Sequence, residues 1–160
     1  MPTVFLADRA LVSVDGPDAE HLLQNIVTTD LDGLSQGEAK PGALLTPQGK
    51  VLFDFLVSRQ GEDGLRLECR RDIADDLVRR LTLYRLRAKA QITKQDQVLV
   101  EVSWDCDSRG SDGESGRSST DSSAGNGEAD QWLADRRFGE RVRRRAVPRC
   151  CMRDTTSCPT

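Results

Sequence analysis

Apolar and polar residues alternate in several short runs of the first hundred positions. Alternation with a period of two is typical of strands that bury one face, and turn residues separate the runs. The hairpin turns are marked by Pro-Gln-Gly-Lys at 47–50 and Gly-Glu-Asp-Gly at 61–64. This pattern predicts strands at residues 4–6, 11–14, 43–46, 50–57, 65–70, 90–93 and 97–104.

Two further segments have apolar residues at helical spacing. Pro17 fits the first position of a helix, and Asp18 and Glu20 suit the positive end of its dipole. Asp72 is placed to cap the second helix. The two apolar faces consist of Ala19, Leu22, Leu23 and Ile26, and of Ile73, Leu77, Val78, Leu81 and Tyr84.

Hairpins with two inserted helices predict an α+β fold, an antiparallel-rich sheet with helices on one face. The order β-α-β-β-α-β would fit a ferredoxin-like core.

Composition divides the chain into three regions. Residues 1–104 are expected to form one folded domain. Residues 105–130 have seven acids, two arginines and almost no apolar side chain, which predicts a disordered linker. Residues 131–160 have eight arginines against three acids and three of the five cysteines. This basic tail is interpreted either as an arm that binds RNA or phosphate, or as a truncated or out-of-frame end, and the second interpretation is favoured.

The overall charge of the chain limits the classes of partner that can be expected. A formal net charge of −3 and a pI near 5.3 give no general attraction to nucleic acid or anionic membranes. No apolar stretch approaches the roughly 20 residues that span a bilayer. The N-terminal residues resemble neither a secretory signal nor a transit peptide, so a cytoplasmic protein is expected, or a mitochondrial matrix protein if the source is eukaryotic.

The cysteines indicate neither a disulfide framework nor a zinc site. They are odd in number, scattered and without a C-x-x-C pair, and the one histidine, His21, is distant in sequence. Cys69 alternates with leucines and is expected to be a small buried apolar residue. His21 is expected to be an ordinary helix residue. The chain has no G-x-G-x-x-G and no G-x-x-x-x-G-K-[ST], so a nucleotide-driven enzyme has no support.

Three blocks, "LVSVDGPDAEHLLQNIVTTDLDGL", "ALLTPQGKVLFDFLV" and "LYRLRAKAQI", resemble the YgfZ-type folate-binding proteins. These proteins share a superfamily with the glycine-cleavage T-protein, an aminomethyltransferase. The resemblance covers about residues 4–104, and "LADRRFGERVRRR" matches a family segment (Asp-x-Arg before a glycine) more loosely. The family's K-G-C-[YF]-x-G-Q-E element is absent, so the chain resembles an N-terminal portion and no cysteine role is carried over.

The resemblance implies linked α/β domains around an opening that binds tetrahydrofolate. It also implies a role as a factor for assembling or repairing iron–sulfur enzymes, and in bacteria a link to tRNA modification. The expected partners are therefore tetrahydrofolate and the iron–sulfur assembly machinery or its client enzymes. No membrane partner is expected, and nucleic acid through the arginine-rich tail is not the favoured partner.

Asp54 falls on a carboxylate that lies by the folate amine in the T-protein relatives. An ionised carboxylate there could orient a pterin amine or stabilise positive charge on nitrogen. Alternation places Asp54 on the face opposite Phe53 and Phe55. Asp54 can therefore be interpreted either as a solvated strand residue or as a ligand contact.

Weaker candidates for the same ligand come from the turn after the first helix and from the hairpin. The resemblance places Gln24, Thr29 and Asp30 near the pocket, with helix capping and turn chemistry as the favoured alternative. Lys50 could face the glutamate tail of folate, although a solvated turn lysine is favoured. No catalytic residue and no metal ligand is predicted.

The leading hypothesis is thus a folate-binding accessory factor for iron–sulfur proteins, a binding factor more than an enzyme. The alternatives are a folate-dependent aminomethyltransferase and an RNA-binding protein that uses residues 136–149. A non-functional product of an incomplete or frameshifted gene is a further alternative.

Overall fold

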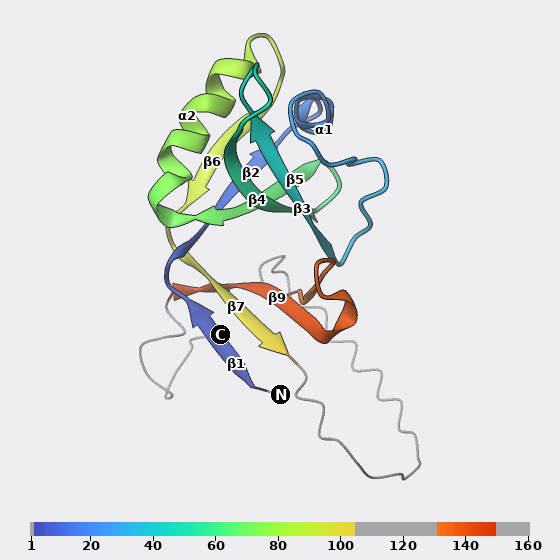
Figure 1. Cartoon of the computed structure of the whole chain (residues 1–160), viewed down its shortest axis with the longest axis vertical. Helices are drawn as coiled ribbons and strands as arrows, with labels where there is room; N and C mark the ends of the chain where they lie inside the picture. The colour runs from blue at the N-terminus through green and yellow to red at the C-terminus, as the bar shows by residue number, and fades with distance from the viewer. Residues whose placement is uncertain (1, 105–130, 150–160) are drawn as a thin grey trace.

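Nine strands form one strongly curled sheet in the computed structural model, which describes residues 2–104 and 131–149 (Figure 1). The strand order is β1-β7-β9-β8-β3-β4-β5-β2-β6. The strands are β1 (Thr3–Leu6), β2 (Arg9–Asp15), β3 (Glu38–Leu45), β4 (Val51–Gln60), β5 (Gly64–Arg70), β6 (Gln91–Gln95), β7 (Val98–Trp104), β8 (Leu133–Asp135) and β9 (Val142–Pro148). The helices are α1 (Ala19–Gln24) and α2 (Ala74–Arg85), with short 3-10 turns η1 (Arg71–Ile73) and η2 (Gly139–Arg141).

The predicted α+β class is confirmed. Strand β5 lies between β2 and β4. The connection that leaves β2 through α1 therefore enters the sheet again on the other side of β5, and the connection through α2 returns to β6, which pairs with β2. The expected β-α-β-β-α-β order is therefore present, with β3 as an additional strand. The sheet is mixed, because β3 and β8 pair in parallel while the other strand pairs among the described residues are antiparallel.

Both helices pack on one face of the sheet, as predicted. Leu77 and Leu81 of α2 and Leu23 of α1 are fully buried against apolar residues of β2, β4 and β5. Each such side chain contributes about 1.5–3 kcal/mol by leaving water. Cys69 belongs to the same core, as expected. Neither helix in the described part of the chain is long and apolar enough to cross a membrane.

The starts of the helices differ from the prediction. Asp72 does not cap α2, because it lies in η1 and pairs with Arg70, and α2 begins at Ala74 without a side-chain cap. Helix α1 begins at Ala19 rather than at Pro17. The Asp18 carboxylate accepts the backbone N–H of Lys89 at 2.7 Å, which ties the start of α1 to the segment before β6.

The hairpin between β3 and β4 follows the prediction. Gly49 has φ +82°, a left-handed conformation that glycine adopts without strain, and its N–H donates to the Thr46 carbonyl at 2.9 Å. Phe55 is buried in the core, whereas its neighbour Asp54 is exposed. Alternation thus places the two residues on opposite faces, as expected.

Residues 131–149 do not form a tail, because they contribute strands to the sheet. Strand β9 pairs with β7 from Val98–Pro148 to Trp104–Val142, and β8 lies between β9 and β3. The predicted boundary therefore does not divide the fold, since residues 133–148 complete the sheet of the first region. Successive arginines hid the alternation of β9, in which Arg144 and Ala146 are buried and Arg143 is exposed. Whether the chain is truncated or out of frame stays a prediction, and the predicted linker 105–130 and Cys150, Cys151 and Cys158 lie outside the described residues.

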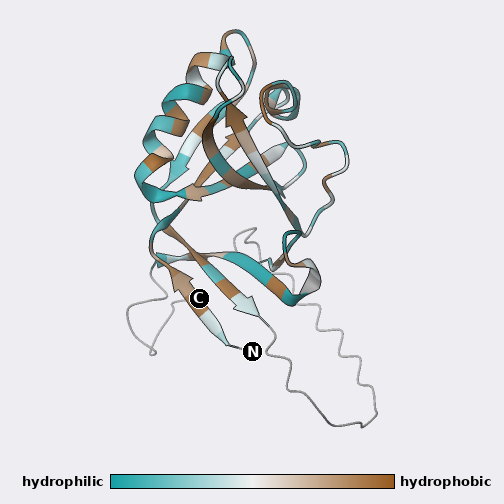
Figure 2. Cartoon of the chain, in the orientation of Figure 1, coloured by the Kyte–Doolittle hydropathy of each residue, from teal (hydrophilic) through white to brown (hydrophobic). Residues whose placement is uncertain are grey.

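A second, smaller core lies on the opposite face of the sheet. The sheet curls so that Leu11 of β2 packs against Val100 and Val102 of β7 and Ala146 of β9. We call this side the inner face; it carries Leu11, Leu56, Glu68, Val102 and Arg144. Figure 2 shows hydrophobic colour along much of the central strands of the helix-covered part and a hydrophilic stretch in β9, which contributes Arg144 to the inner face.

Candidate functional site

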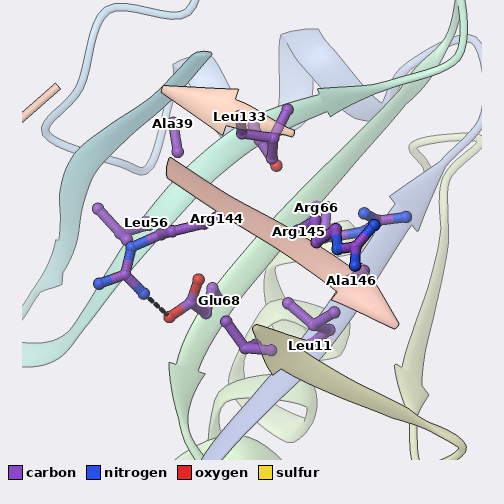
Figure 3. Close-up of a pocket in the computed structure, with 11 residues that line it drawn as sticks. Leu11, Ala39, Leu56, Arg66, Glu68, Leu133, Arg144, Arg145 and Ala146 are labelled. Carbon is purple, nitrogen blue, oxygen red and sulfur yellow. Dashed lines mark hydrogen bonds and ion pairs between the residues drawn. The ribbon is translucent and has the colours of Figure 1, made fainter. Parts of the chain in front are cut away.

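Three buried ionisable side chains meet on the inner face. Arg144 of β9 donates from Nη1 to Glu68 Oε1 of β5 at 2.5 Å and from Nε to Asp135 Oδ2 of β8 at 2.7 Å. Their side chains are 10%, 9% and 0% exposed, respectively. Figure 3 shows Arg144 reaching Glu68 beneath β9. One guanidinium therefore joins β9 to the preceding strand β8 and to β5, which is distant in sequence.

Two further arginines flank this centre. Arg9 Nε donates to Glu68 Oε1 at 3.0 Å. Arg137 donates to Asp135 from Nε at 3.0 Å and from Nη2 at 2.8 Å, a bidentate geometry that favours the ionised carboxylate. We call these five residues the Arg144 network; it consists of Arg9, Glu68, Asp135, Arg137 and Arg144.

The network keeps Asp135 ionised in spite of its burial. Burial by itself would raise the pKa of Asp135, but the hydrogen bonds from Arg137 and Arg144 outweigh it and hold this pKa below its ordinary value. Hydrogen bonding to Asp135 in turn raises the pKa of Arg137. The charges satisfy one another, which is typical of a structural ion network.

A cavity of about 20 Å³ adjoins the network. That volume holds about one water molecule. Pockets that take drug-sized ligands measure about 300–1,000 Å³, so no pterin fits here. Its lining (Figure 3) consists of Leu11, Ala39, Leu56, Ser58, Arg66, Glu68, Val100, Leu133, Arg144, Arg145 and Ala146.

Asp54 lies outside this cavity. Its side chain is exposed on the face of β4 that also carries Leu56, and it lines none of the three pockets of about 20, 260 and 450 Å³. Its charge nevertheless acts on Arg137, whose pKa is raised by Asp135 first and by Glu68 and Asp54 in addition. Asp54 is therefore electrostatically coupled to the outer end of the Arg144 network, and its role as a ligand contact stays a prediction.

The predicted ligand residues around the end of α1 form hydrogen bonds that stabilise the turn there. Gln24 donates from Nε2 to Asp30 Oδ1 at 3.1 Å, and its Oε1 accepts the Leu31 N–H at 2.8 Å. The Thr29 hydroxyl donates to the Pro41 carbonyl. These contacts match the alternative of turn chemistry.

The surroundings of Lys50 and Cys69 do not indicate a catalytic or ligand-binding role. Lys50 is exposed, and its backbone N–H donates to the Thr46 hydroxyl at 3.1 Å. Burial raises the pKa of Cys69 to about 11, so its thiol stays protonated at neutral pH. No group of three or more potential metal ligands occurs among the residues that the structure describes.

A second, polar pocket of about 260 Å³ lies between the β4–β5 hairpin and the start of β8. Arg59 on its wall pairs with Glu20 at 2.6 and 3.1 Å and donates to the Leu31 and Leu34 carbonyls. The hydrogen bond from Arg59 lowers the pKa of Glu20. Arg59 is therefore engaged in holding α1 to the sheet.

The Arg144 network escaped the sequence analysis, although it left two signals. Arg66 and Glu68 alternate with Leu65, Leu67 and Cys69 in β5, which indicated a polar face without showing that the sheet curls over it. Asp135 and Arg137 belong to the loosely matched Asp-x-Arg segment. Arg144 had no signal, because it is one of three consecutive arginines.

Comparison with known proteins places the chain beside iron–sulfur assembly factors. It is 36% identical over 109 residues to the mitochondrial iron-sulfur cluster assembly factor IBA57 homolog of Pyricularia oryzae, covering 62% of this chain and 27% of that protein. It is 34% identical over 100 residues to the tRNA-modifying protein YgfZ of Yersinia pseudotuberculosis, covering 62% and 30%. No protein-family model matches the chain.

The solved structures support the fold. The glycine cleavage system aminomethyltransferase T of Bartonella henselae matches with a TM-score of 0.57 and 19% identity, over 62% of this chain and 27% of that one. The chain thus spans less than a third of the length of the relatives it matches.

Proposed function

We infer that this chain, which is similar to IBA57 and YgfZ proteins over 62% of its length, belongs to the YgfZ/IBA57 family and is an accessory factor in the assembly or repair of iron–sulfur proteins. The observation that carries the proposal is the 36% identity to a protein named as an iron–sulfur cluster assembly factor. That relative is named mitochondrial. We therefore propose the mitochondrial matrix as the location for a eukaryotic source, and the cytoplasm otherwise.

The chemistry of the described residues supports a binding role more than a catalytic one. The buried charges of the Arg144 network pair with one another, and the buried thiol of Cys69 is held in its neutral form. The proposal therefore assigns contact with the assembly machinery or its client proteins, and no bond-making step, to this part of the family's fold.

Tetrahydrofolate, expected from the resemblance, has no pocket of its size at Asp54 or at the Arg144 network, and the pocket of about 450 Å³ that the described residues form is lined instead by Asp8, Arg70, Arg71 and Asp72. Asp54 is exposed and lines none of these pockets, and the cavity nearest the Arg144 network holds about one water molecule. We therefore propose that folate binding in this family needs polypeptide beyond the described residues, with Asp54 at the rim of the site. Gln24, Thr29, Asp30 and Lys50 receive no ligand role in this proposal.

Calorimetric titration tests the folate proposal. Tetrahydrofolate added to this chain should give no saturable heat, and Asp54→Asn should behave identically. Saturable binding that Asp54→Asn weakens would contradict the proposal, because it would place a complete folate site within this chain.

Complementation tests the assembly role. The chain is produced in cells that lack their own YgfZ-type factor, and the activity of iron–sulfur enzymes is measured in extracts. Restored activity is the expected result. Arg144→Met, which removes the centre of the network, should restore less. Unchanged enzyme activity in cells that accumulate folded chain would exclude the role for this polypeptide.

Contact with RNA is the second candidate, because Arg136, Arg143 and Arg149 are exposed on the segment that carries β8 and β9. Other arginines of the segment serve the fold instead, since Arg144 is buried and Arg145 donates to Glu101 at 2.6 Å. Electrostatic RNA binding would weaken steeply with salt, with the logarithm of the affinity falling linearly with the logarithm of salt concentration. A titration of RNA at several salt concentrations distinguishes this candidate from the first.

A further inference from the structure

Strand β1 ends the sheet and has a partner on one side among the described strands, β7. Val4 is 42% exposed and Phe5 39%, and Trp104 at the end of β7 is 36% exposed. Val4 faces the same side as Val102, with which it is paired, and Phe5 faces the other side. Figure 1 shows β1 at the border of the sheet, away from both helices. The border therefore exposes Val4 on one face and Phe5 on the other, where Phe5 lies opposite Glu101 of β7.

The two borders of the sheet differ in protection. Native proteins usually block an edge strand with charges, proline or a bulge, because its open backbone groups can pair with another chain. At the far border, β6 carries Lys94, which pairs with Asp75 at 2.9 Å and with Asp96 at 3.5 Å. Strand β1 reads Thr-Val-Phe-Leu and has no charge.

The hydrogen-bond pattern shows which groups of β1 are open. The Trp104 N–H donates to the Pro2 carbonyl, and Val4 and Val102 are paired two positions further along. Hydrogen-bonded and non-hydrogen-bonded pairs alternate along an antiparallel ladder, so Val4 and Leu6 direct their N–H and C=O groups toward β7. Thr3 and Phe5 direct theirs toward the open side.

We propose that β1 pairs with β1 of a second copy of this chain, antiparallel about a two-fold axis at Val4. Thr3 then faces Phe5 of the second copy in a hydrogen-bonded pair, and Phe5 faces its Thr3. The four backbone hydrogen bonds use every open N–H and C=O group of Thr3 and Phe5 in both copies. Val4 meets Val4 of the second copy in the close, non-hydrogen-bonded position.

A second copy of this chain is the partner we choose, because the open backbone groups of β1 are complementary to themselves about a two-fold axis. The open groups lie two residues apart around one apolar side chain, so a two-fold axis satisfies them all, as an isologous interface requires. No like charges face one another, because β1 is uncharged. A four-residue strand buries less area than the roughly 1,200–2,000 Å² of stable interfaces, so the dimer should be reversible.

Sedimentation velocity over a range of concentrations tests the proposal, under reducing conditions because the chain has five cysteines. The wild-type chain should shift from monomer to dimer as concentration rises. Val4→Lys places two like charges across the axis and should raise the dissociation constant roughly tenfold. The matched control is Thr93→Lys, which adds the same charge to exposed Thr93 on β6 and should leave the dimer unchanged.

Mixing two variants tests the axis itself. Val4→Lys and Val4→Asp should each dimerise about tenfold more weakly than the wild type when alone, and should form a tighter heterodimer when mixed, since opposite charges directly across a ladder attract. A monomeric wild type at every concentration would overturn the proposal. So would a dimer that persists unchanged in both variants. Because wild-type behaviour alone can refute it, the test does not depend on the variants folding.

Discussion

At the scale of single residues, Arg144 connects one partner that is near in sequence with one that is distant. It holds Glu68, 76 positions away, and Asp135, nine positions away. A buried ion pair is often no more stable than an apolar replacement, because desolvation offsets the attraction. Removing one partner is costly, however, since it leaves the other charges buried and unpaired. The network therefore specifies the position of β9 more than it adds stability.

Arg144→Met tests that cost. The substitution keeps an apolar stem but leaves Asp135 and Glu68 with fewer donors, and the free energy of unfolding should fall by about 3–5 kcal/mol. Urea denaturation followed by circular dichroism measures it. Arg143→Met, next to it but exposed, should stay within about 0.5 kcal/mol of wild type. Equal losses in the two variants would show that Arg144 has no special role.

The pH dependence of stability reports on Asp135. Its pKa is lowered in the folded state, so the stability it contributes is present above its unfolded pKa of about 3.9 and is lost as pH falls through the folded pKa. Urea unfolding at pH 7, 5, 4 and 3 should show wild-type stability falling below about pH 4. Asp135→Asn should be less stable at pH 7 and should lack part of this fall. A variant with the wild-type slope would contradict the assignment.

At the scale of elements, α2 shows how one apolar stripe fixes a helix to the sheet. Leu77 and Leu81 are fully buried, whereas Leu83 is 62% exposed on the same helix. Strand β9 is also held by its buried side, but there the buried residues include a charged one, because the guanidinium of Arg144 lies on the same side as Ala146. Each element is held by the side that faces the sheet.

Two leucine-to-alanine substitutions in α2 show how much of the stability depends on the burial of the leucine side chain. Leu77→Ala should lower the free energy of unfolding by about 2–5 kcal/mol, because it removes core contacts and leaves a cavity. Leu83→Ala deletes the same atoms from an exposed position and should change stability by less than about 0.5 kcal/mol. Denaturant midpoints of the two variants measure the difference, and a comparable loss at both positions would mean that the helix is packed otherwise.

The elements also show what the sequence could predict. Alternation in β4 and β5 and helical spacing in α2 reflect local contacts, so both the strands and the buried face of α2 followed from pattern alone. Strand β9 did not, because the partners that neutralise Arg144 lie on β5 and β8 and only the fold brings them together. The small cavity at the network was unpredictable for the same reason, and Asp54 is exposed and does not line it.

At the scale of the whole molecule, the described residues form one continuous sheet from two stretches of chain. Residues 131–149 pair with β7 and β3 on the two sides of β8 and β9, and Arg144 fixes them to β5. The proposed assembly role therefore belongs to this joined unit and not to residues 2–104 alone. The uncharged β1 border remains the place where the unit can meet a second copy.

Hydrogen exchange of the β9 amides tests this unity most directly. If residues 142–148 complete the sheet, their amides should be protected to nearly the same opening free energy as those of β5, and Arg144→Met should lower the protection of β9 first. Amides of β9 that exchange as fast as an unstructured peptide, while β5 stays protected, would show that the arginine-rich segment is a tail after all.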